Sequence, residues 1–164
     1  MPKSDAPTWE SEGMRTHGIT FEEHAIGARH ETLARTVAET DIVTFVNLCG
    51  FTEPLFMDME YVKKASVFGR RAAPGALTFA LAEGLIIQTG LIHGTAMAYL
   101  GGEMRVVAPV LEGDTLRVEI EVVDKRETKK PDRGIVTYQH RVLNQRDELV
   151  LEARIQRMIR RATA

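Results

Sequence analysis

The chain has 164 residues, which is enough for one domain whose hydrophobic core needs no metal or disulfide support. Its 21 lysines and arginines almost balance its 23 aspartates and glutamates, so we expect no general attraction to nucleic acid or to an anionic membrane. The single cysteine, Cys49, excludes an internal disulfide, and the five histidines show no metal-ligand spacing. We therefore expect a cytoplasmic protein without a metal or cofactor.

The beginning of the chain carries scattered charges and lacks the apolar block of a signal peptide. We interpret residues 1–24 as an N-terminal arm that could be mobile, followed by a single domain over residues 25–164. The longest uncharged run, Gly84 to Gly102, is interrupted by glycines and polar side chains. A membrane-spanning helix is therefore not expected.

The first elements of the domain are short. Residues 29–37 alternate loosely between apolar and polar and predict a strand. A short helix is expected at about 41–49, because Thr40 can cap its start and Gly50 can end it in the left-handed conformation. Residues 50–73 show no sustained period and predict an irregular segment.

A longer helix is predicted over residues of about 75–89, beginning after Pro74 and ending at Gly90. Its side chains are apolar nearly all round, and the one acidic residue, Glu83, is expected at its wet end. A helix without a wide polar face must be wrapped by other elements.

Strand-like segments supply this wrapping, at residues 96–109, 115–124, 134–144 and 148–159. The second is the clearest, because its apolar residues alternate with charged ones: Leu116, Val118, Ile120 and Val122. We expect four strands in an antiparallel meander, curled around the helix in an α+β fold. One such sheet leaves edge strands uncovered, so we expect a homodimer or a larger even oligomer.

Three segments of the sequence resemble one family: "GFTEPLFMD", "FGRRAAPGAL" at the start of the long helix, and "APVLEGDTLRVEIEV". Over residues of about 25–161 the chain is similar to the MaoC-like dehydratases and (R)-specific enoyl-CoA hydratases of the hotdog fold. The resemblance implies a ligand that is acyl-CoA or another acyl thioester. It also implies that this ligand lies between subunits, with its carbonyl near the amino end of the central helix.

The hydratase motif of that family reads roughly Gly-Asp-x-Asn-Pro-x-His, and its aspartate and histidine act on the water and the substrate protons. In this chain Gly50 and Pro54 match the motif. Phe51 stands at the aspartate position, Glu53 at the asparagine position and Phe56 at the histidine position. The usual acid/base pair is therefore replaced.

Glu53 is the predicted catalytic residue, because it is the only ionisable group inside the motif. An extended residue before proline would place it on the same side as Phe51. The alternative is a surface glutamate in a turn. His93, which follows the long helix between glycines, is the second catalytic candidate. The remaining histidines carry less weight: His17, His24, His30 and His140.

The substrate-binding residues are expected at the same end of the domain. Phe51, Phe56 and Met57 would form an apolar wall for the acyl chain. Backbone N–H groups of Gly75 and Ala76, in the first turn of the long helix, would bind the thioester oxygen. Arg70 and Arg71, which stand before this helix, would contact the phosphates of coenzyme A. The alternative is that both are ordinary surface arginines.

Three functions are consistent with these residues. The first is an acyl-CoA hydratase or dehydratase, a lyase with a non-standard acid/base group. The second is a non-catalytic acyl-thioester-binding protein, or a subunit that supports an active partner. The replacement of the motif aspartate and histidine favours this second function. The third is a hotdog thioesterase, which needs a carboxylate near the thioester carbon, either Glu53 or, less plausibly, Glu83.

Overall fold

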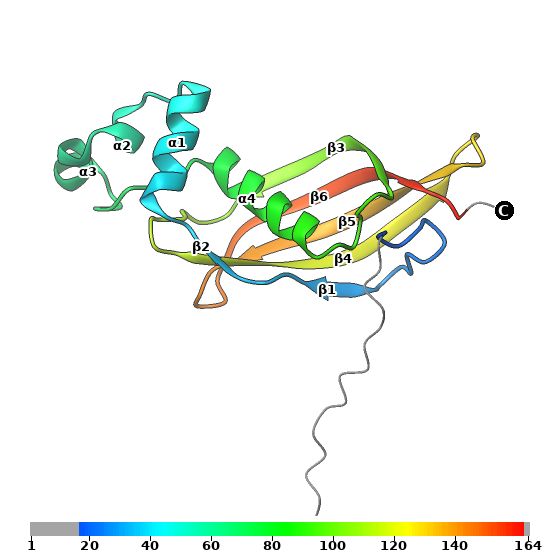
Figure 1. Cartoon of the computed structure of the whole chain (residues 1–164). Helices are drawn as coiled ribbons and strands as arrows, with labels where there is room; N and C mark the ends of the chain where they lie inside the picture. Colours follow the sequence, from blue (N-terminus) through cyan, green and yellow to red (C-terminus); the bar gives the residue numbers. More distant parts are fainter. Residues whose placement is uncertain (1–16, 163–164) are drawn as a thin grey trace, which may run out of the picture.

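A computed structural model describes residues 17–162 (Figure 1). In this part of the chain the strands and helices follow the order β1 (Arg29–Glu31), β2 (Arg35–Thr36), α1 (Glu39–Cys49), α2 (Pro54–Met57), α3 (Met59–Ala65), α4 (Gly75–Gln88), β3 (Ala96–Val106), β4 (Thr115–Glu127), β5 (Arg133–Leu143) and β6 (Leu149–Arg160). The predicted α+β composition and the long helix are confirmed, and α4 ends within one residue of the expected position.

The strands form one antiparallel sheet in the order β1-β4-β5-β6-β3, and β2 pairs with the start of β4. The predicted four-strand meander is wrong for β3, which pairs with β6 rather than with β4. The connection from β3 to β4 must cross the end of the sheet, because β6 and β5 lie between these two strands. It begins beside β6, where the N–H groups of Val107 and Ala108 donate to the carbonyl of Val150. Alternating side chains indicate which face of a strand is buried, but they do not identify its neighbours.

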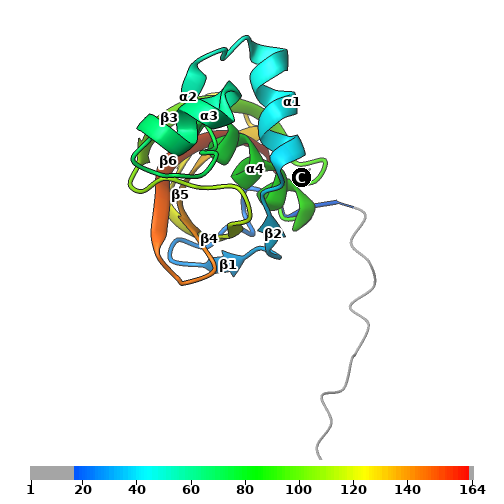
Figure 2. The ribbon, with the colours of Figure 1, turned by 90° about the vertical axis from the view of Figure 1, so that its left-hand side faces the viewer.

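Helix α4 lies against the inner face of the curled sheet, which is clearest in the end-on view of Figure 2. The core between them is formed by alternate strand residues and one side of the helix, including Val118, Ile120, Ile155, Leu85 and Ile86. The residues predicted to point inward from β4 are all buried. A sheet wrapped around one helix is the arrangement expected of a hotdog fold.

The opposite side of α4 is not wrapped in the single chain. Small residues are exposed there, among them Ala76 and Ala80. The adjacent strand β3 is the free edge of the sheet, and several of its large apolar side chains are exposed: Met97, Tyr99, Leu100, Met104 and Val106. We call this surface of α4 and β3 the open face.

The α1–α3 segment projects beyond one end of the sheet, next to the start of α4 (Figure 1). Helix α1 begins two residues earlier than predicted, and Thr40 is not its cap. Instead, the N–H of Ala38 donates to the carboxylate of Asp41 at 2.9 Å. Gly50 ends the helix with φ 69°, the left-handed conformation that was predicted for it.

An N-terminal strap, residues 18–28, closes the other end of the sheet. Phe21 is buried against Gly134, and its backbone N–H donates to the carbonyl of Arg160. His24 is fully buried, with Nδ1 2.7 Å from the carbonyl of Thr20 and Nε2 2.8 Å from the hydroxyl of Tyr138. Residues 17–24 of the predicted arm therefore pack on the domain, and residues 1–16 lie outside the described part of the chain.

Burial sets the protonation of this contact. It lowers the pKa of His24 and raises the pKa of the Tyr138 hydroxyl, so both groups are neutral near pH 7. Nδ1–H of His24 then donates to the carbonyl of Thr20, and the hydroxyl of Tyr138 donates to Nε2 of His24. The hydrogen bond from Tyr138 fastens the strap to the inner face of β5, and the bond to Thr20 holds the His24 ring within the strap.

Candidate active site

The predicted motif forms a loop and one short helix at the projecting end of the molecule. Glu53 is extended, with φ −67° and ψ 141°, and stands at the N-cap of α2. Phe51 packs edge-to-face on Phe45, with 5.7 Å between ring centroids, and remains partly exposed. Met57 is also exposed, whereas Phe56 packs against the core. The three apolar residues of the predicted acyl wall therefore face different surroundings in the single chain.

The two predicted catalytic residues lie at different ends of the domain. Glu53 is exposed on the α1–α3 segment, which lies at the end of the sheet where α4 begins. His93 is exposed in the turn after α4, where its carbonyl accepts from the N–H of Gly18 of the strap. The 14 residues of α4 separate this turn from Gly75, which is roughly 21 Å at the rise of an α-helix. One chain does not bring His93 to a ligand held at the start of α4.

The two predicted phosphate-binding arginines differ from each other. Arg71 is buried, and its guanidinium donates to the carboxylate of Glu39 at 2.9 Å and to the carbonyl of Phe56. It thereby ties α1 and α2 to the segment that leads into α4. Arg70 is exposed and donates to the carbonyl of Glu112. Of the two, Arg70 is the one whose side chain is accessible to a ligand.

The start of α4 is the predicted position of the oxyanion site. The first N–H groups of a helix, here those of Gly75 and Ala76, have no intrahelical acceptor. Pro74, the N-cap, supplies no side-chain hydrogen bond to replace it. The helix dipole favours negative charge at this end. A Cβ atom on Gly75 would lie 2.7 Å from Cγ2 of Val106, so glycine allows β3 to pass close to the helix start. This end of α4 is thus next to the open face.

A cluster of charged side chains in the interior was not predicted. Glu83 does not point to a wet end of α4; its carboxylate pairs with Arg157 of β6 and lies 3.4 Å from Nδ1 of His140 on β5. Burial alone would raise the pKa of Glu83, but the hydrogen bond from His140 and the charge of Arg157 outweigh it and lower that pKa. The guanidinium of Arg157 also lies over the ring of Tyr99, 5.4 Å from its centroid. Glu83 is therefore held ionised inside the domain.

The sequence contains a signal for this cluster. Within β6, Arg157 occupies an inward position of the same alternation that buries Ile155 and Ile159. His140 likewise follows the inward position of Tyr138 on β5. An inward arginine and an inward histidine opposite a helix with one acidic residue indicate a buried ionic contact.

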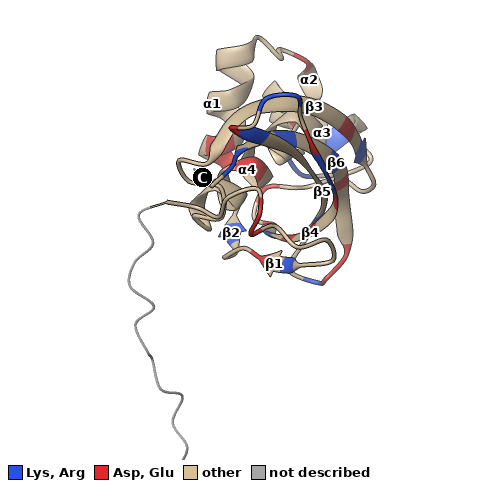
Figure 3. Ribbon diagram, turned by 90° about the vertical axis from the view of Figure 1, so that its right-hand side faces the viewer, with Lys and Arg blue, Asp and Glu red and all other residues tan. Residues whose placement is uncertain are grey.

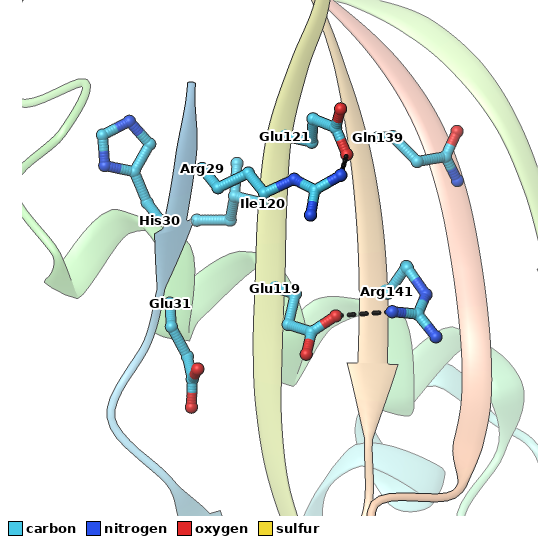
Figure 4. Close-up of a pocket in the computed structure, with 8 residues that line it drawn as sticks. All are labelled: Arg29, His30, Glu31, Glu119, Ile120, Glu121, Gln139 and Arg141. Atoms are coloured by element: carbon cyan, nitrogen blue, oxygen red, sulfur yellow. Dashed lines mark hydrogen bonds and ion pairs between the residues drawn. The ribbon is translucent and has the colours of Figure 1, made fainter. Parts of the chain in front are cut away.

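The pocket in Figure 4, about 540 Å³, lies on the outer face of the sheet, away from the predicted site. It is lined by Arg29, His30, Glu31, Glu119, Ile120, Glu121, Gln139 and Arg141. The charges pair with each other, Arg29 with Glu121 at 3.1 Å and Arg141 with Glu119 at 2.6 Å. Figure 3 shows acidic and basic residues interspersed along the strands. We interpret this face as a solvated charge ladder across the strands.

The described residues contain no group of three or more histidine, cysteine or acidic side chains arranged to hold a metal ion. No helix in this same part of the chain is long and apolar enough to cross a membrane.

The comparison with known families identifies the class of protein. The family model of the MaoC like domain matches residues 21–144, so the chain belongs to this family. The match covers the strap from Phe21 onward, the projecting helices, α4 and the strands as far as the end of β5. A search of functionally curated proteins found no match.

Solved structures support the same assignment. The monoamine oxidase regulatory protein of Archaeoglobus fulgidus is 39% identical, with a TM-score of 0.82, and the match covers 90% of this chain and 97% of that one. The (R)-hydratase PhaJ1 of Pseudomonas aeruginosa is 30% identical, with a TM-score of 0.74 and 88% of each chain covered. A MaoC-like dehydratase of Rhodospirillum rubrum is 29% identical, with a TM-score of 0.77, and covers 90% of this chain and 100% of that one. The hotdog fold and the hydratase/dehydratase family are thus confirmed.

Proposed function

We propose that this protein is an acyl-thioester hydratase or dehydratase that adds water to, or removes it from, the carbon–carbon double bond next to a thioester. The observation that carries the proposal is the start of α4, where uncapped N–H groups adjoin the open face. Family membership supports the same reaction class.

The proposed binding mode places the thioester oxygen at the N–H groups of Gly75 and Ala76. Negative charge develops on this oxygen when water attacks the double bond, and a helix start stabilises such charge. The acyl chain would extend along the apolar surface of Phe51, Phe56 and Met57. Coenzyme A is the proposed carrier, and exposed Arg70 is the side chain proposed to contact its phosphates.

A second copy of the chain is proposed to complete this site. The open face exposes apolar side chains on β3, an edge strand of eleven residues that pairs with β6 on one side, and such an edge is a template for pairing. The start of α4 adjoins that edge through the contact of Gly75 with Val106. A homodimer would therefore cover the ligand at the open face and leave the pantetheine end accessible.

Glu53 is proposed as the proton-transfer group on the motif loop, because it is the one ionisable residue of the replaced motif. Glu53→Gln removes the acid/base function with little change in size, and loss of such a group typically costs about 10²–10⁴ in rate.

The test is turnover of a panel of enoyl and 3-hydroxyacyl thioesters of different chain length, with coenzyme A and with a carrier protein, followed by the loss of absorbance of the conjugated double bond. Binding is measured in parallel by calorimetry. A protein that binds these thioesters but neither hydrates nor dehydrates any of them would instead be the non-catalytic binder that Phe51 and Phe56 favour. Release of free thiol would identify a thioesterase.

A further inference from the structure

One nitrogen in the interior cluster has no hydrogen-bond partner among residues 17–162: Nε2 of His140, on the side of the ring away from Glu83, whose Oε1 lies 3.4 Å from Nδ1. His140 is only 2% exposed, and the side chain of Glu83 is 16% exposed. Buried polar atoms of folded proteins are nearly always satisfied by protein, water or ligand. A small hydrogen-bonding molecule is therefore expected beside Nε2 of His140.

From this geometry we propose that His140 is a catalytic acid/base residue of this protein and that Glu83 is its positioning residue. The proposal rests on the proposed hydration reaction, but it assigns the proton transfer to His140 instead of Glu53, so the two assignments are alternatives that the experiment below separates. In the family motif an aspartate and a histidine stand where this chain has Phe51 and Phe56. We assign the missing carboxylate and imidazole to Glu83 and His140, inside the curled sheet.

The neighbours of His140 determine which ring nitrogen is free. A carboxylate 3.4 Å from Nδ1 favours the tautomer with the proton on Nδ1, so Nε2 carries a lone pair and can accept a proton. Arg157 holds the other oxygen of Glu83 and fixes the direction of the carboxylate. A base oriented by a third group is the arrangement used by catalytic side chains, and the contact is often long when no ligand is bound.

The three side chains come from regular elements that hold them in place. Glu83 is in α4, His140 in β5 and Arg157 in β6, and all three project into the space between helix and sheet. Burying an ion pair costs several kcal/mol and often gives no more stability than apolar packing. A role in the reaction accounts for keeping these groups where Leu or Met would pack.

His140 lies on the side of the cluster that faces the proposed thioester site. Along β6, Ala153 pairs with His140 and Arg157 pairs with Val136, so His140 is farther along β5 toward its end at Leu143. That end of β5 lies beside the start of β4 and therefore toward the start of α4, as Figure 1 shows.

The distances along the helix fit a ligand that spans the two places. Glu83 follows Gly75 by about two turns, roughly 12 Å, and helical side chains tilt back toward the helix start. A thioester oxygen held at Gly75 would therefore direct the double bond toward His140. A water molecule can bridge the remaining gap to Nε2.

The inner face of the sheet offers an approach to the imidazole from the open face. In the row that contains His140, the next inward residues are Ala153 on β6 and Met104 on β3. Alanine is small, and Met104 is flexible and 45% exposed. A ligand that enters beside β3 needs to displace one methionine side chain to reach His140.

The chemical step is balanced with these groups alone. Nε2 of His140 takes one proton from water as the water oxygen bonds to C3 of the enoyl thioester. The electrons of the double bond move to the thioester oxygen, which the N–H groups of Gly75 and Ala76 stabilise. The imidazolium then returns the same proton to C2 as the enolate collapses. One water is consumed, and dehydration is the reverse sequence.

The experiment compares the hydration rate of the full chain with those of His140→Gln, Glu83→Gln and Glu53→Gln. His30→Gln is the matched control, because Nε2 of His30 is also buried without a hydrogen-bond partner in the described chain, but no acidic side chain is paired with its ring. We expect His140→Gln to lower kcat by about 10²–10⁴ with a small change in KM, and the control to stay within about threefold. Circular dichroism and light scattering check that each variant is folded and assembled.

Imidazole rescue separates catalysis from a structural role. In His140→Ala, added imidazole should restore part of the rate in proportion to its concentration, and it should have no effect on His30→Ala. If His140→Gln does not fold, Glu83→Gln decides, because it keeps the size of the side chain and should lower kcat at least tenfold.

Two outcomes would overturn the proposal and leave the hydratase function intact. The first is full activity in either His140→Gln or Glu83→Gln. The second is that Glu53→Gln is the one variant that loses activity. Absence of turnover by the unmodified protein on every enoyl and 3-hydroxyacyl thioester would reject the hydratase function itself, and this proposal with it.

Discussion

The contact between Tyr138 and His24 provides a quantitative test of the folded structure. In Tyr138→Phe the ring remains in the core, but Nε2 of His24 loses its donor while fully buried. An unsatisfied buried acceptor costs about 1–3 kcal/mol. For a chain of this size each kcal/mol lowers Tm by roughly 2–4 °C, so we expect a decrease of about 2–12 °C.

The assay is thermal unfolding followed by circular dichroism at pH 7.5, where His24 is neutral. Tyr61→Phe is the control, because Tyr61 is exposed on α3 and such surface changes usually stay within about 0.5 kcal/mol. Equal Tm values for the two variants would show that the hydrogen bond does not hold the strap, and the assigned tautomer of His24 would then be wrong.

Four further predictions follow from other contacts. Because burial lowers the pKa of His24, the unfolded chain binds a proton below about pH 6.5 that the folded chain does not, so unfolding titrations should show stability falling as pH drops below that value. Gly134→Ala would place a Cβ against the ring of Phe21; chemical denaturation should show a loss of about 1–3 kcal/mol, and an unchanged midpoint would contradict the packing. Arg71→Met should raise hydrogen exchange in residues 50–58 more than in β5, and uniform exchange would count against its tethering role. Light scattering at micromolar concentration should give a dimer that Met104→Lys weakens; a monomeric unmodified protein would refute the proposed pairing.

The parts of the fold that could be predicted from sequence are those with a strong local cause. Pro74 and Gly90 bracket α4, and the apolar residues between them leave no alternative to a buried helix. The alternation from Leu116 to Val122 gave both the strand and its inward face correctly. In contrast, the place of β3 beside β6 depends on a crossing connection, and no local pattern distinguishes it from a hairpin.

The candidate site was less predictable for a physical reason. Glu53 was predicted because the family motif surrounds it, but a motif does not show how exposed a side chain is, and Glu53 is exposed. Glu83 and His140 belong to different elements, 57 positions apart in the numbering, and only the packing of α4 on the sheet brings them together. A single acid in an apolar helix is ambiguous until its partner on the facing strand is known.

The two edges of the sheet are unequal, and this has a consequence for growth into larger assemblies. On one side, β4 is covered by the short strands β1 and β2, which offer few free backbone groups. On the other side, β3 is long and uncovered. A chain with two long free edges can add copies indefinitely and form a filament. In this protein, pairing of β3 with β3 of a second chain would use the one long edge that the described residues leave free. Strand addition would therefore stop at the dimer.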